Sequence, residues 1–157
     1  MVHRLFLLFV LVPTLCLAQQ FSSHKSVTLD SIFAQWDEIT KTYTPGMSVM
    51  QPQKVRFDAK YLSHPQPCST RTLEVIFNTL AMPDLLKKMA VTHCIKFSSD
   101  SGREVTAWIQ DVLIPGLNAD AKLNGQVEIY ADLLAYGVST DRSHNMPFIL
   151  VGRFEPK

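Results

Sequence analysis

The chain has 157 residues, of which 46% are hydrophobic, and it carries 15 Lys and Arg residues against 14 Asp and Glu residues. This near-neutral balance gives no bulk electrostatic attraction to nucleic acid or to an anionic membrane surface. The six glycines form no glycine-rich turn that leads into a helix, so we expect no nucleotide and no other cofactor.

Residues 1–18 have the pattern of a cleavable signal peptide. A positively charged start precedes an apolar run from Leu5 to Val12, and the small residue Ala18 suits a cleavage site. The run is shorter than the about 20 residues that a membrane-spanning helix needs, and it lacks the polar face of a core helix. We therefore predict a single globular domain over residues 19–157, periplasmic or secreted and without stable membrane insertion.

Two cysteines follow the predicted cleavage site, Cys68 and Cys94. In an oxidising compartment an even pair is typical of a disulfide. Two reduced thiols, a metal site or a reactive thiol are the alternatives. A bridge would hold the segment between the two residues onto the neighbouring sheet.

The first expected element is a helix that Thr28 caps. Its apolar residues fall on one helical face, and it ends near Thr44-Pro45-Gly46. Residues 47–53 are expected to form a loop. Alternation from Val55 to Tyr61 then predicts a half-buried strand, which two prolines in His64-Pro65-Gln66-Pro67 should end.

The segment from Thr70 to Ala90 is ambiguous. Leu73, Ile76, Phe77 and Leu80 have helical spacing, although residues 75–77 could also form a strand. We favour a helix, followed by a second short helix that Pro83 opens.

Alternating apolar residues predict four strands in the C-terminal part of the chain. They cover residues 91–97, 105–109, 127–136 and 148–154. A turn is expected at Asp100-Ser101-Gly102, a loop through Pro115-Gly116 and Asn124-Gly125, and a polar loop at residues 139–145.

These elements predict an α+β fold, in which an N-terminal helix packs on a curled antiparallel sheet. The two helices predicted at Thr70–Ala90, which we call the helical excursion, pack on the same sheet. Successive strands with short connections usually pair antiparallel, and a curled sheet of this kind is a small barrel or half-barrel. The layout resembles oligonucleotide/oligosaccharide-binding barrels in architecture, but no family motif accompanies it.

No motif for catalysis or metal binding stands out. His93 and Cys94 are adjacent, so on a strand their side chains point to opposite faces and do not form a catalytic pair. The spacing of His64, Cys68, His93 and Cys94 matches no zinc pattern, and Met47/Met50 and His144/Met146 are weak copper candidates. Glu128 and Asp132 share a strand face, and Asp132 could pair with Asp111 or Glu104 across the sheet, as a carboxylate hydrolase would require.

The candidate binding residues are aromatic and acidic: Trp108, Tyr130, Asp132 and Tyr136. Tyr130, Asp132 and Tyr136 alternate along one strand, and Trp108 would join them if the two strands are neighbours. Aromatic rings among polar groups suit sugars, peptides or another protein. The alternative is a second core layer under the leading helix, which carries Phe33 and Trp36. The polar loop at residues 139–145 is a second candidate for recognition.

We expect an exported, non-enzymatic binding domain that contacts a protein or envelope polymer, of the inhibitor, immunity or accessory type. A small carboxylate-based hydrolase of envelope polymers and a metal-handling periplasmic protein are the alternatives. No metal site and no nucleic-acid partner are expected.

Overall fold

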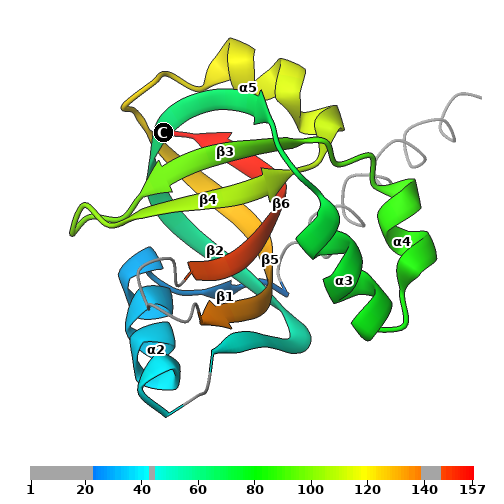
Figure 1. Cartoon of the computed structure of the whole chain (residues 1–157). Helices are drawn as coiled ribbons and strands as arrows, with labels where there is room; N and C mark the ends of the chain where they lie inside the picture. The colour runs from blue at the N-terminus through cyan, green and yellow to red at the C-terminus, as the bar shows by residue number, and fades with distance from the viewer. Residues whose placement is uncertain (1–22, 43–44, 139–145) are drawn as a thin grey trace, which may run out of the picture.

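The computed structural model describes residues 23–42, 45–138 and 146–157. The predicted signal peptide and the polar loop at residues 139–145 lie outside these residues. Figure 1 shows a curled sheet with helices at two ends and on one side. In chain order, the elements are β1 (Lys25–Ser26), α2 (Leu29–Thr42), β2 (Gly46–Pro67), α3 (Arg71–Thr79), α4 (Pro83–Lys88), β3 (His93–Ser98), β4 (Glu104–Ile109), a 3-10 turn (Asp111–Leu113), α5 (Ile114–Asp120), β5 (Gln126–Val138) and β6 (Met146–Pro156).

The sheet closes on itself into a five-stranded barrel. The strand order is β1-β2-β3-β4-β6-β5, and the additional pairing of β2 with β5 completes the ring. Most neighbours are antiparallel, as predicted, but β4 and β6 are parallel, and so are β1 and β2. With a helix between β4 and β5, this connectivity matches the Greek-key barrel of the oligonucleotide/oligosaccharide-binding fold. The predicted fold class is therefore confirmed, with a mixed sheet.

Helices close both ends of the barrel (Figure 1). At one end α2 inserts four buried residues, Leu29, Ile32, Phe33 and Trp36, into the core that the inward side chains of the barrel strands form. At the other end α5 contributes the fully buried Leu117. Burial of large apolar side chains at both ends contributes most of the packing free energy of such a domain.

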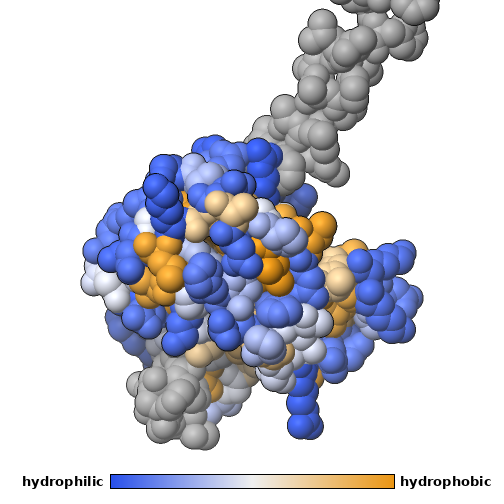
Figure 2. All heavy atoms as spheres, turned by 90° about the horizontal axis from the view of Figure 1, so that it is seen from above, coloured by the Kyte–Doolittle hydropathy of each residue, from blue (hydrophilic) through white to orange (hydrophobic). Residues whose placement is uncertain are grey.

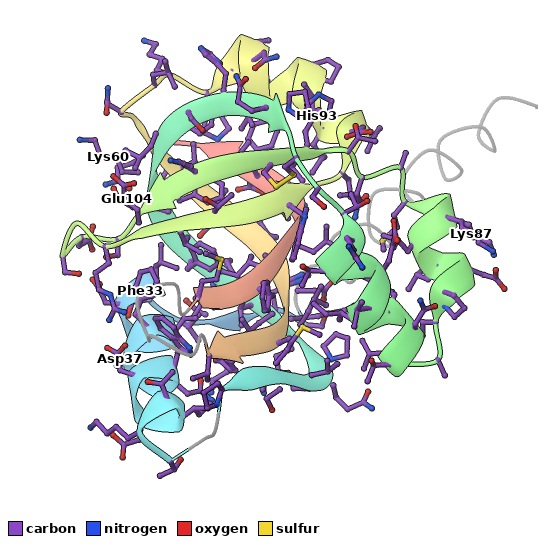
Figure 3. All side chains as sticks on the ribbon, viewed as in Figure 1. Phe33, Asp37, Lys60, Lys87, His93 and Glu104 are labelled. Carbon is purple, nitrogen blue, oxygen red and sulfur yellow. A yellow bond between two sulfur atoms is a disulfide. The ribbon has the colours of Figure 1, made fainter. Side chains whose placement is uncertain are left out.

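The start of α2 and its contact with the β3–β4 turn are fixed by polar groups. The Ser31 amide donates to Thr28 Oγ1 at 3.0 Å, which confirms the predicted cap. Arg103, just after the turn, donates two hydrogen bonds to the Asp37 carboxylate at 2.6 and 3.0 Å. The same guanidinium lies 4.3 Å from the centroid of the Phe33 ring. Figure 3 shows Phe33 and Asp37 on α2.

The helical excursion between β2 and β3 builds a second, smaller core on the outside of the barrel. Leu73, Ile76 and Phe77 of α3 pack there with Trp108, Leu134 and Leu150 from three barrel strands. The predicted disulfide joins Cys68, directly after β2, to Cys94 of β3, with 5.7 Å between the Cα atoms. It borders this second core and ties the beginning of the excursion to the sheet, as expected.

The predicted start and the predicted end of β2 are both wrong. Residues 47–53 are part of the strand, because Gly46 to Val49 pair with the end of β5, and the register shift before Gln53 accommodates Pro52. Pro65 and Pro67 also lie within β2. That portion pairs with β3 along one edge and has no strand partner on its other edge among the described residues, so a missing N–H is tolerated there.

The expected loop between β4 and β5 is wrong in its first half. The 3-10 turn and α5 occupy residues 111–120, and Pro115 sits in the first turn of α5, where its missing N–H costs nothing. The predicted helices at Thr70–Ala90 are confirmed as α3 and α4, because tertiary burial of Leu73 and Ile76 settles the ambiguity between helix and strand.

Candidate binding groove

A register shift in β5 separates the predicted aromatic residues. Leu133 pairs with Ile149 and Ala135 with Phe148, so β5 has one extra residue at this point. The alternation changes phase there, and Tyr136 points into the main core, whereas Tyr130 lies on the outer face. The prediction that Tyr130 and Tyr136 share a face is therefore wrong. A binding role for these residues stays a prediction.

Trp108 belongs to the second core. Its side chain is 7% exposed, its Nε1 donates to the Ser69 carbonyl oxygen at 3.2 Å, and its ring stacks on Phe148. The helix that covers it is α3, and the expectation that the leading helix would cover this face is wrong. Since β6 lies between β4 and β5, Trp108 is also not a direct neighbour of the residues on β5.

Tyr130 lies in a ladder of charged residues on the outer face of β2, β5 and β6. Arg56 and Arg153 flank it in register, and Glu128 accepts a hydrogen bond from its hydroxyl at 2.8 Å. The next row places Asp58, Glu128 and Glu155 side by side. Ion pairs join Lys157 to Asp58, Arg56 to Glu128 and Arg153 to Glu155. Neighbouring cations thus compensate each carboxylate of this row, an arrangement typical of a stabilised sheet face.

Asp132 has a different environment from these paired acids. It lies opposite Lys54 of β2 and Leu150 of β6, so the predicted pairing with Asp111 or Glu104 is wrong, because β6 separates β5 from β4. Burial raises the pKa of Asp132, and the charges of Lys54 and His24 only partly oppose this effect. Asp132 therefore carries a desolvated carboxylate on the outer face of β5.

A histidine–carboxylate pair lies near the α5 end of the barrel, where Figure 3 places His93. His93 Nδ1 is 3.2 Å from Asp111 Oδ1, and Thr92 donates to the same carboxylate through its amide at 3.0 Å and its hydroxyl at 2.8 Å. Burial alone would raise the pKa of Asp111, but the hydrogen bonds from Thr92 and His93 outweigh it and lower that pKa. Cys94 is in the disulfide, so the structure leaves no thiolate beside His93.

Within residues 23–42, 45–138 and 146–157, no three His, Cys, Asp or Glu side chains converge as metal ligands. His144 of the copper candidate pair lies outside these residues. No helix in the described part of the chain is long and apolar enough to cross a membrane. Seen from the α5 side, the described surface is mostly hydrophilic, with small and separate hydrophobic patches (Figure 2).

A hollow of about 380 Å³ lies between α3 and the ends of three barrel strands. We call it the helix–strand groove. Its lining residues are Gly46, Met47, Arg71, Thr72, Val75, Gly137, Val138 and Phe148. Val75 is 47% exposed, and Met47 and Phe148 are partly exposed, so the groove presents apolar surface to solvent.

Close packing shapes the floor of the helix–strand groove. The Phe148 ring lies over the backbone of Gly137, where an added Cβ atom would come within 3.0 to 3.1 Å of two ring carbons. Phe148 in turn stacks on the buried Trp108. A glycine at position 137 therefore allows the ring to lie against β5, and the core residue Trp108 supports it from below.

The rim of the groove carries an uncompensated positive charge. The Arg71 guanidinium is exposed and has no hydrogen bond or ion pair with any of the residues that the structure describes. Its neighbour on the helix, Glu74, accepts a hydrogen bond from the Thr70 hydroxyl at 3.2 Å and lines a different hollow. The groove thus combines an apolar floor with a free cation.

The second hollow, of about 480 Å³, lies between α3 and α4. Its charged residues already have partners within the excursion: Glu74 accepts from Thr70, and Lys87 Nζ lies 3.2 Å from Asp84 Oδ1. Figure 3 shows Lys87 on α4. This hollow therefore offers a ligand fewer free charged groups than the helix–strand groove does.

The sequence-based candidates do not include the residues that line the groove. Trp108 comes nearest, because its ring touches the ring of Phe148. Arg71 and Val75 are four residues apart on α3, and the apolar Val75 on the exposed side of this amphipathic helix is the signal that could have indicated them.

No protein-family model matches the chain, and no curated protein matches it by sequence.

Proposed function

We propose that this protein is an exported binding module that holds a segment of a protein or envelope polymer in the helix–strand groove. The observation that carries this proposal is a solvent-accessible apolar groove with the free guanidinium of Arg71 at its rim. Arg71 has no acidic partner among the described residues, and a charged group left unpaired beside an apolar hollow is typical of a binding site.

The position of the groove in the barrel supports the same proposal. Barrels of this architecture bind ligands next to the connection between their first and second strands and the connection between their fourth and fifth. Here the first of these connections contains α3, and Val138 and Met146 flank the second. The groove lies between them. Because one fold hosts many functions, this agreement supports the location of the site, and the lining residues must identify the ligand.

The exposed outer faces of β3 and β4 are a poorer binding surface. Lys96, Glu104 and Thr106 project there, and Trp108, the aromatic residue in the same row of β4, is covered by α3. The export that we propose agrees with the disulfide, which persists in oxidising compartments.

Site-specific photocrosslinking in the producing cells tests the proposal. A photoreactive amino acid replaces Val75 in the groove or, as a matched control, Leu85 on α4; the two residues are 47% and 44% exposed. We expect a defined crosslinked product from position 75 that is absent from position 85. No product from position 75, or the same products from both positions, would contradict the proposed site.

A further inference from the structure

We propose that the helix–strand groove binds a short apolar peptide segment that carries a carboxylate next to its apolar side chain. This inference rests on the proposed binding function of the groove and specifies its ligand. It follows from three properties of the described residues: the apolar floor, the charge at the rim and the volume.

The floor selects an apolar group. Met47, Val75, Val138 and Phe148 surround the hollow, and the polar side chains that line it, Arg71 and Thr72, both belong to α3. The Phe148 ring lies against the backbone of Gly137 and stacks on the Trp108 ring, so moving it away from either one would lose packing. A buried apolar side chain of the ligand would therefore meet a preformed surface, which lowers the entropic cost of binding.

The rim selects an anion, and a carboxylate fits it best. The planar guanidinium of Arg71 can donate two parallel hydrogen bonds to a carboxylate. The amide of Thr72, in the first turn of α3, has no acceptor among the described residues, and it adds positive potential on the same side of the groove. Among residues 23–42, 45–138 and 146–157, no acidic side chain lines the groove, so a carboxylate there would meet no like charge from this part of the chain.

The volume of about 380 Å³ is near the lower end of the range for ligand sites. It suits one or two side chains of an extended peptide. A glycan would expose its hydroxyl groups to the apolar floor without acceptors. The carboxylate can belong to an Asp or Glu side chain or to the free end of the partner chain, because both have the same chemistry.

A synthetic library of random short peptides, made once with free C-termini and once with amidated C-termini, tests this inference. The protein is produced from its full-length sequence, and binding is followed through the backbone amide signals of Thr72, Val75 and Gly137 in NMR spectra. We expect binders that combine an apolar residue with a carboxylate. Loss of binding on amidation would identify the chain end as the source, and retained binding by peptides with Asp or Glu would identify the side chain.

Arg71→Gln should weaken the best binder by about tenfold or more, because charge-assisted hydrogen bonds are lost. Lys88→Gln, which removes an exposed cation from α4, is the matched control and should leave the affinity unchanged. Thermal melts establish that both variants remain folded.

The outcomes separate this inference from the proposed function. Binders that shift the groove signals but lack a carboxylate, or that bind the Arg71→Gln variant equally well, overturn the ligand class and leave the groove as a binding site. The same conclusion follows if no peptide binds while position 75 still crosslinks to a partner. If no peptide binds and position 75 gives no product, both proposals fail.

Discussion

The indole ring of Trp108 stacks on the phenyl ring of Phe148, with the ring centroids 5.6 Å apart and the ring planes inclined by 22°. One ring is buried beneath α3 and hydrogen-bonded to Ser69, and the other forms the floor of the helix–strand groove. The stack therefore couples the second core to the proposed binding surface. A substitution of either ring should therefore change the packing of the other.

Replacing Trp108 with Ala should destabilise the domain by about 3–5 kcal/mol, because the substitution leaves a cavity under α3. Chemical denaturation monitored by circular dichroism measures this loss. Phe148→Leu keeps most of the apolar volume and should cost less than about 1.5 kcal/mol, while it changes the floor of the groove. If Trp108→Ala leaves the stability unchanged but reduces partner binding, Trp108 is a binding residue that the fold does not need.

Replacing Cys68 or Cys94 with Ser should lower the melting temperature by several degrees and reduce the amount of secreted protein. The chain-entropy estimate for a loop of this length is roughly 3.5 kcal/mol. Differential scanning calorimetry of each variant measures the effect. The unreplaced protein treated with a reductant should show the same loss. An unchanged melting temperature in the Cys68→Ser variant would mean that the bridge does not stabilise the excursion.

Replacing Asp132 with Asn should stabilise the protein near neutral pH. Burial raises the pKa of Asp132 in the folded state above its unfolded value of about 3.9. The stabilisation that the protonated Asp132 carboxyl gives to the folded state is therefore fully present below the unfolded pKa. It is lost as the pH rises through the folded pKa. Thermal melts at pH 7 should show a higher melting temperature for Asp132→Asn, and melts at pH 3 should show little difference. A lower melting temperature at pH 7 would mean that Lys54 compensates the charge fully.

Replacing Tyr136 with Phe should leave the domain as stable or make it more stable. The Tyr136 hydroxyl is buried and has no hydrogen-bond partner in the part of the chain that the structure describes, and an unsatisfied buried polar group costs roughly 1–3 kcal/mol. Urea denaturation compares this variant with Tyr61→Phe, which removes a hydroxyl that lies 3.5 Å from His64 Nδ1. Destabilisation of more than about 1 kcal/mol by Tyr136→Phe would indicate a bound water at the hydroxyl.

Most of the elements could be predicted because their apolar residues follow a regular period. The face of α2 and the alternation in β3, β4 and β6 are both visible in the sequence, and the parity of the two remaining cysteines indicates the disulfide. The helical spacing of Leu113, Leu117 and Ala121 could also have predicted α5, but the Pro and Gly residues between them suggested a loop.

The site was harder to predict because it depends on pairing over long distances in the chain. A one-residue register shift in β5 turns Tyr136 inward, and local alternation contains no sign of it. The place of β6 between β4 and β5 separates Trp108 from Asp132, and only the parallel closure of the barrel reveals this order. The groove itself brings together Met47, Arg71 and Phe148, which are far apart in the sequence.

The parallel contact between β4 and β6 in the barrel has only two register pairs, Trp108 with Leu150 and Ile109 with Val151. The other barrel contacts each have five or more. Local opening of a domain begins where the fewest hydrogen bonds must break. Amide hydrogens in the contact between β4 and β6, which we call the seam, should therefore exchange with solvent sooner than those between β2 and β5. Because Trp108 and Phe148 lie on the two sides of the seam, a ligand that holds Phe148 in place should slow this exchange.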